Sequence, residues 1–128
     1  MASPVKVLII EDTRLDAMVV SAMLHKFHCE ITMAMNGKES VDLFIEGRKF
    51  DIIFCDKDMP IMSGPEAIDK IRAMGESDVK IVGLSANNNA QEVFINVGAD
   101  VFVPKPMKFD VLKDMIQEVI NKKNNSMV

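Results

Sequence analysis

Short apolar runs alternate along the chain with longer segments in which apolar residues recur every three or four positions. Runs of about four to eight apolar, largely β-branched residues are typical of strands buried on both faces, and the longer periodicity is typical of amphipathic helices. The predicted strands are Val5–Ile10, Cys29–Ala34, 51–55, 79–84 and 101–103. Strict alternation of strand and helix predicts an α/β fold, a doubly wound five-stranded parallel sheet with right-handed crossovers and helices on both faces.

Each helical segment has an apolar stripe that is expected to face the sheet. The predicted inner positions are Leu15, Met18, Val19, Ala22 and Met23; Val41, Phe44 and Ile45; Ala67, Ile68, Ile71 and Met74; Val93, Phe94 and Val97; and Leu112, Met115, Ile116, Val119 and Ile120. Asn36 with Glu39, and Ser63 with Glu66, have the spacing of capping boxes at helix starts. Gly98 follows the fourth helical segment and is expected to end it.

Length and composition suit one globular domain of 128 residues, 48% of them hydrophobic and 27% charged. We predict a single domain over 1–128, with a core of about 5–120 and a polar, frayed tail at 121–128. A net charge of -4 argues against nucleic acid as the main partner, because phosphate backbones need a basic surface. We expect no membrane partner either, since no apolar run is long enough to span a bilayer and no secretory signal opens the chain. Two cysteines without metal-type spacing indicate a cytoplasmic protein, with the nucleus also compatible.

Polar residues with useful chemistry follow most of the predicted strands. Glu11 and Asp12 follow the first strand, Asp56 the third, Ser85 the fourth and Lys105 the fifth. Any one of them alone is most simply a solvated turn residue. The carboxyl ends of parallel strands lie at one edge of the sheet, however, and that edge is where sites form. We therefore expect these side chains to converge in one crevice.

Three carboxylates that meet in one crevice repel each other, and this repulsion would raise at least one of their pKa values. A hard divalent cation relieves the repulsion, and oxygen ligands with room for water suit Mg²⁺ better than zinc. Beside the cation, an ionised Asp56 is a nucleophile that can attack phosphorus and form an acyl phosphate. The phosphoryl group then needs donors and cations around its oxygens, which Ser85 and Lys105 supply.

Four segments together resemble the receiver domains of two-component response regulators. They read IED at 10–12, DKDMPIMSG at 56–64, LSA at 84–86 and VPKP at 103–106. The resemblance covers nearly the whole chain and implies a flavodoxin-like sheet with the strand order 2-1-3-4-5. It also implies that Asp56 is the phosphoacceptor, which receives its phosphoryl group from a phosphohistidine on a histidine kinase or a histidine phosphotransfer protein. The DKD triplet is similar to the small plant type-C response regulators.

The resemblance assigns the metal ligands as well. It implies that Asp12 and Asp56 bind Mg²⁺ directly and that Glu11 acts through water. The third protein ligand would be the backbone carbonyl of Asp58. We also expect the Asp58 side chain to overhang the site, where it would orient a water that attacks phosphorus.

Three further roles follow from the same resemblance. Ser85 resembles the hydroxyl that turns toward the phosphoryl group, and Lys105 resembles the cation that pairs with it. The bond between Lys105 and Pro106 matches one that is usually cis in the family. Phe102 stands where the family has a rotating aromatic residue, and it is the expected switch. Ser63 departs from the common pattern, in which an aspartate is frequent, and this departure is expected to alter only a helix cap.

The resemblance implies a signalling module that promotes only its own phosphorylation and dephosphorylation, not an enzyme. With no output domain expected, it would act on a downstream protein target or drain phosphate from a relay, and the lifetime of the acyl phosphate separates these two roles. The two aspartates of the DKD triplet also resemble the haloacid-dehalogenase phosphatases, in which the motif normally lies on the first strand. Turnover of a generic phosphate ester would distinguish that family. His25 and His28 lack a third ligand and are interpreted as exposed histidines.

Overall fold

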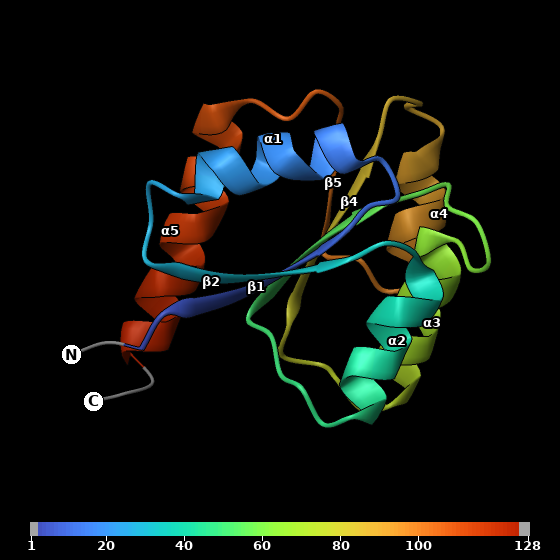
Figure 1. Cartoon of the computed structure of the whole chain (residues 1–128), viewed down its shortest axis with the longest axis horizontal. Helices are drawn as coiled ribbons and strands as arrows, with labels where there is room; N and C mark the ends of the chain where they lie inside the picture. Colours follow the sequence, from blue (N-terminus) through green and yellow to red (C-terminus); the bar gives the residue numbers. More distant parts are fainter. Residues whose placement is uncertain (1–2, 126–128) are drawn as a thin grey trace.

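The computed structural model describes residues 3–125 as one parallel sheet flanked by helices (Figure 1). The strands are β1 (Val5–Ile10), β2 (Cys29–Ala34), β3 (Ile52–Asp56), β4 (Lys80–Ser85) and β5 (Val101–Pro104). The helices are α1 (Arg14–Leu24), α2 (Gly37–Ile45), α3 (Gly64–Ala73), α4 (Ala90–Asn96) and α5 (Phe109–Asn125). The strands pair in parallel in the order β2-β1-β3-β4-β5, which confirms the predicted fold class and strand order.

Helices cover both faces of the sheet, with α1 and α5 on one side and α2, α3 and α4 on the other (Figure 1). Successive residues of a strand point to opposite faces. Val7 and Ile9 of β1 therefore pack toward α1 and α5, whereas Leu8 and Ile10 pack toward the other three helices. Burial on both faces explains why the central strands are continuous apolar runs in the sequence.

The first two strands have the predicted bounds, and the third and fourth lie one residue further along the chain than predicted. The shift has a structural consequence, because Asp56 and Ser85 are the last residues of β3 and β4. Asp56 pairs in register with Leu84, and Ser85 pairs with Pro104. The backbone of both polar residues is therefore held by the sheet rather than by a loop.

The predicted inner face of α1 is wrong. Leu15, Met18 and Val19 are exposed, and the buried residues of α1 are Ala17, Val20 and Leu24. Of the remaining predicted positions, Ala22 is exposed and Met23 is half-buried against the core. Apolar residues occur on nearly all sides of this helix, so the 3.6-residue period does not select one stripe. Packing against the sheet and α5 decides the rotation.

Three other predicted inner residues are exposed in the structure, namely Ile45 in α2, Val93 in α4 and Met74, which directly follows α3. Each lies beside a residue or stripe that does face the sheet, and a helix that packs on one side buries only part of its apolar surface. The predicted face of α5 is confirmed, with Leu112, Met115, Ile116 and Val119 buried and Ile120 packed against them.

The predicted helix caps are confirmed. The Asn36 side chain accepts a hydrogen bond from the backbone N–H of Glu39 at 2.9 Å, and the Ser63 hydroxyl accepts one from that of Glu66 at 3.3 Å. The turn after α4 is made at Gly98, whose φ of 110° is in the left-handed region that glycine favours.

The tail predicted at 121–128 begins instead as helix, because α5 continues to Asn125. Lys123 in the last turns of α5 forms an ion pair with Asp51 at 2.7 Å, and this contact ties the helix end to the start of β3. Residues 126–128 lie outside the described part of the chain. Among residues 3–125, no helix has both the length and the apolar character that a membrane crossing requires.

Candidate phosphoacceptor site

The site lies at the carboxyl edge of the sheet, where the strands deliver their polar residues. Glu11 and Asp12 follow β1, Asp56 ends β3, Ser85 ends β4, and Lys105 follows β5. Because β1, β3 and β4 are neighbours in the sheet, their ends lie side by side. The predicted convergence of these residues thus has its physical basis in the strand order.

Three carboxylates form the acidic part of the site. Ligand oxygens of Glu11, Asp12 and Asp56 lie within 4.8 Å of one another. Glu11 is the most enclosed of the three, with 5% of its surface exposed. Burial raises the pKa of Glu11 above its usual value, the hydrogen bond from Lys105 acts in the opposite direction, and the negative charge of Asp56 adds to the rise. Repulsion from Asp56 thus contributes to the raised pKa of Glu11, but burial is the larger cause.

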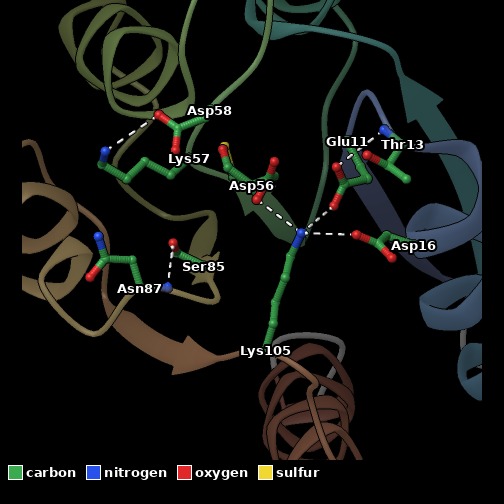
Figure 2. Close-up of polar contacts among 10 residues, drawn as sticks. Glu11, Thr13, Asp16, Asp56, Lys57, Asp58, Ser85, Asn87 and Lys105 are labelled. Atoms are coloured by element: carbon green, nitrogen blue, oxygen red, sulfur yellow. Dashed lines mark hydrogen bonds and ion pairs between the residues drawn. The ribbon is translucent and has the colours of Figure 1, made fainter.

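Lys105 partly offsets this negative charge. Its Nζ lies 2.7 Å from Glu11 Oε1, 3.0 Å from Asp56 Oδ1 and 3.3 Å from Asp16 Oδ2, and Figure 2 shows it reaching between these three side chains. Burial alone would lower the pKa of Lys105, but the hydrogen bonds to Glu11 and Asp56 raise it above its usual value. The amine is therefore a cation at neutral pH. The Lys105–Pro106 bond is cis, as the resemblance implied.

Asp16 is the site residue that the sequence analysis missed. It lies in the first turn of α1, and its carboxylate approaches Lys105 from the helix side of the crevice. The available signal was an acidic residue one helical turn after Asp12. That signal is ambiguous, because acidic residues are common in the first turn of a helix, where they complement its dipole.

Ser85 and Asn87 lie together on the other side of Asp56 (Figure 2). Ser85 is buried, and its Oγ accepts a hydrogen bond from the backbone N–H of Asn87 at 3.1 Å. The Asn87 side chain in turn accepts a hydrogen bond from the backbone N–H of Asn89 at 2.9 Å. The Ser85 hydroxyl is thus held at the strand end with its own hydrogen available for a partner.

Asp58 lies at the exposed rim. Its side chain is 83% exposed and forms an ion pair with Lys57 at 3.3 Å. This carboxylate is not part of the acidic group of Glu11, Asp12 and Asp56 found among the described residues. Any contribution of Asp58 to a metal site through its backbone carbonyl stays a prediction.

Phe102 is half-buried on the α4 side of the sheet. Its ring stacks on that of Phe94, with ring centroids 6.1 Å apart. Phe94 is fully buried and lies directly over Gly83, where a Cβ atom would overlap the ring. The expected rotation of Phe102 therefore starts from a packed arrangement that includes α4, and the role of Phe102 as a switch stays a prediction.

The acidic group fits a hard divalent cation. Its donors are carboxylate oxygens, it includes no thiolate, and His25 and His28 are exposed at the far end of α1. Burial and, to a lesser extent, the negative charge of Asp56 raise the pKa of Glu11, and a cation bound beside it would favour the charged form of this carboxylate. The residues therefore fit Mg²⁺.

A model of the response regulator receiver domain matches residues 7–117, so the chain belongs to this family of two-component signalling modules, which is not a classical enzyme family. The chain is also 50% identical over 124 residues to two-component response regulator ORR42 of Oryza sativa subsp. japonica. That match covers 97% of this chain and 93% of the rice protein. The motifs had predicted this family, and the dehalogenase alternative is set aside.

Two solved structures show the same fold with sequence similarity. The receiver domain of Ssk1 of Saccharomyces cerevisiae, solved together with the histidine phosphotransfer protein Ypd1, has a TM-score of 0.82 and 27% identity, and the match covers 92% of this chain and 90% of that one. The receiver domain of sensor histidine kinase PA1611 of Pseudomonas aeruginosa PAO1 was solved with a magnesium ion in its active site cleft. It has a TM-score of 0.80 and 27% identity, and the match covers 92% of this chain and 98% of that one.

Proposed function

We propose that Asp56 accepts a phosphoryl group from a phosphohistidine on a partner protein, with Mg²⁺ bound by Glu11, Asp12 and Asp56. The observation that carries the proposal is that the Asp56 carboxylate lies close both to the carboxylates of Glu11 and Asp12 and to the ammonium of Lys105. Asp56 shares the 4.8 Å grouping with Glu11 and Asp12, and its Oδ1 lies 3.0 Å from the Lys105 ammonium. Its side chain is 13% exposed, which leaves an opening toward a donor.

The transfer requires one bond to form and one to break. A carboxylate oxygen of Asp56 forms a bond to phosphorus while the bond between phosphorus and the donor imidazole nitrogen breaks, and that nitrogen keeps the electron pair and takes a proton. When bound, Mg²⁺ would offset the charge of the carboxylates and of the phosphoryl oxygens. In this proposal Lys105 would contact the phosphoryl oxygens as a cation, and Ser85, which is buried at the end of β4, would contact them as a hydroxyl donor.

The donor class is supported by a relative. The Ssk1 receiver domain, which is similar to this chain over most of its length, was solved with a histidine phosphotransfer protein. A protein of that kind, or a histidine kinase, is the proposed donor here. The coordinated magnesium ion of the PA1611 receiver supports the choice of cation.

The acceptor is tested with Asp56→Asn, which keeps the side-chain shape and removes the nucleophilic charge. The wild type and the variant are incubated with phosphoramidate and Mg²⁺, and the intact proteins are weighed by mass spectrometry. We expect the wild type to gain one phosphoryl mass and the variant to gain none. Asp69→Asn, an exposed substitution on α3 with the same change in charge, is the control and should behave as the wild type. Phosphorylation of Asp56→Asn to a similar extent would refute the assignment.

We further propose that the phosphorylated protein hydrolyses its own acyl phosphate, with water attacking phosphorus and the Asp56 carboxylate leaving. Asp58 and Asn87 lie two residues after Asp56 and Ser85, and in this proposal their polar groups orient that water. Decay measured after removal of the donor decides between two roles in a relay. A long-lived acyl phosphate supports a module that signals to a downstream protein, and a short-lived one supports a phosphate sink.

A further inference from the structure

The Lys105 ammonium is shared among three carboxylates that come from three elements. Glu11 follows β1, Asp56 ends β3, and Asp16 lies on α1. The ammonium donates hydrogen bonds to Glu11 and Asp16 and forms an ion pair with Asp56, so Asp16 takes up one of its three N–H donors. A phosphoryl group on Asp56 takes the place of the contact between Lys105 and the Asp56 carboxylate, and it then shares the ammonium with Asp16.

Asp16 is the contact that is easiest to release. Its distance to Nζ, 3.3 Å, is the longest of the three, against 2.7 Å for Glu11 and 3.0 Å for Asp56. Its side chain is 48% exposed, compared with 5% for Glu11 and 13% for Asp56. Water therefore screens the attraction between Asp16 and Lys105 more than the other two.

The charges around Lys105 are unbalanced. Three carboxylates contact the ammonium, and a fourth, that of Asp12, is grouped with Glu11 and Asp56, so negative charge remains in excess. Asp16 adds to this excess and lies outside the grouping of Glu11, Asp12 and Asp56 that fits a cation. A carboxylate in that place repels an incoming anion and competes with it for the same ammonium.

We propose that Asp16 is a positioning residue that holds the Lys105 ammonium toward α1 and thereby weakens the binding of a phosphoryl group at Asp56. The proposal rests on the function proposed above for Asp56 and adds a regulator of that site. Both effects of the Asp16 charge, repulsion of the anion and competition for Lys105, act in the same direction. Glu11 and Asp56 keep Lys105 in the crevice when the Asp16 charge is removed.

A purely structural role for Asp16 has a different signature. An acidic residue in the first turn of a helix stabilises that helix through its dipole. If that were its only role, Asp16→Asn would lower the melting temperature and leave the affinity for a phosphoryl analogue unchanged. If Asp16 instead held Lys105 in its productive position, the same variant would bind the analogue more weakly.

The experiment compares the full-length wild type with Asp16→Asn, Asp16→Glu and Asp69→Asn. Beryllium trifluoride, a tetrahedral analogue of the phosphoryl group, is titrated into each protein at saturating Mg²⁺ and followed by amide NMR, since the chain has no tryptophan or tyrosine to report by fluorescence. We expect Asp16→Asn to bind the analogue about two- to fivefold more tightly, a change in affinity that corresponds to the free energy of one half-exposed ion pair. Asp16→Glu retains the charge and should remain near the wild type, as should Asp69→Asn.

Two further readouts separate the possible explanations. Titration with Mg²⁺ alone should show equal or weaker binding for Asp16→Asn, because a lost carboxylate cannot attract a cation. The ¹⁵N signal of the Lys105 ammonium should shift in Asp16→Asn without any ligand and stay in place in Asp69→Asn. If the wild type binds the analogue and Asp16→Asn binds it equally or more weakly, the inference is overturned. If the wild type and Asp56→Asn bound it equally, the proposed function would fail, and the inference with it.

Discussion

Replacing Lys105 with methionine removes the cation that, among residues 3–125, contacts both Asp56 and Glu11, while keeping a side chain of similar length. Lys105 lies 2.7 Å from Glu11 and 3.0 Å from Asp56, and these two carboxylates have 5% and 13% of their side chains exposed. Without the ammonium they would face each other and Asp12 in a poorly solvated crevice. We therefore expect Lys105→Met to destabilise the metal-free protein.

The size of the effect follows from the geometry. With an effective dielectric constant of ~20, two unit charges about 3 Å apart attract by roughly 5 kcal/mol before the cost of burial is counted. Removing one partner of a fully buried pair costs about 3–5 kcal/mol. Because 23% of the Lys105 side chain is exposed, we expect a smaller loss than for a fully buried pair, about 2–3 kcal/mol. In a domain of this size, such a loss lowers Tm by roughly 8–12 °C.

The dependence on pH has a definite sign. Hydrogen bonds to Glu11 and Asp56 raise the pKa of Lys105 above its ordinary value of 10.5, so its contribution to stability is present below that pH and is lost only at higher pH. At acidic pH its partners become protonated, and the contribution shrinks. The difference in stability between wild type and Lys105→Met should therefore be largest between about pH 7 and pH 9 and smallest near pH 3.

Thermal unfolding followed by far-UV circular dichroism, with and without Mg²⁺, measures both consequences. Mg²⁺ should raise the Tm of Lys105→Met more than that of the wild type, because the variant has no ammonium to compete with the cation. Lys49→Met is the matched control, since Lys49 has an ion pair of 2.6 Å with Glu76 but is 73% exposed, and it should cost less than about 1 kcal/mol. Equal losses of stability in Lys105→Met and Lys49→Met would refute the reasoning. A smaller rise of Tm with Mg²⁺ for Lys105→Met than for the wild type would refute it as well.

Three further predictions concern the same edge of the sheet. Gly64→Ala would place a Cβ atom onto the backbone oxygen of Asp56, so α3 must shift. We expect the free energy of unfolding, measured in urea, to fall by about 1–3 kcal/mol and phosphorylation to become slower. A variant with the stability and phosphorylation rate of the wild type would contradict the close approach. Glu11→Gln should weaken Mg²⁺ binding. Because the pKa of Glu11 is raised above its usual value of 4.5, protonation of Glu11 should reduce the Mg²⁺ affinity of the wild type at a higher pH than for an ordinary glutamate, and the variant should lose less affinity as the pH falls. Calorimetric titrations between pH 5 and pH 8 measure this, and parallel curves of affinity against pH for the two proteins would contradict it. Asp58→Met should slow decay of the acyl phosphate if Asp58 orients the attacking water, and unchanged or faster decay would show that it does not.

Local sequence determined the architecture of this protein and much of its site. Alternation of short buried strands with helical segments was enough to predict a parallel sheet, because that pattern has few other ways to bury its apolar residues. Caps were predictable at Asn36 and Ser63, since they depend on residues three positions apart. The placement of Glu11, Asp56 and Lys105 at one edge also followed from the sequence, since each comes at or directly after a strand end.

The tertiary structure alone decided which sides of the helices are buried and which charges meet. The apolar residues of α1 surround the helix, so only packing against the sheet and α5 could leave Leu15 exposed and bury Leu24. Asp16 and Lys105 are 89 positions apart, and their contact depends on how the first turn of α1 is placed at the carboxyl edge of the sheet. Strand ends were predictable to within about one residue because each buried apolar run gives way to polar residues at the edge of the sheet. The meeting of two long side chains depends on helix rotation and on a balance of charges, which no local pattern encodes.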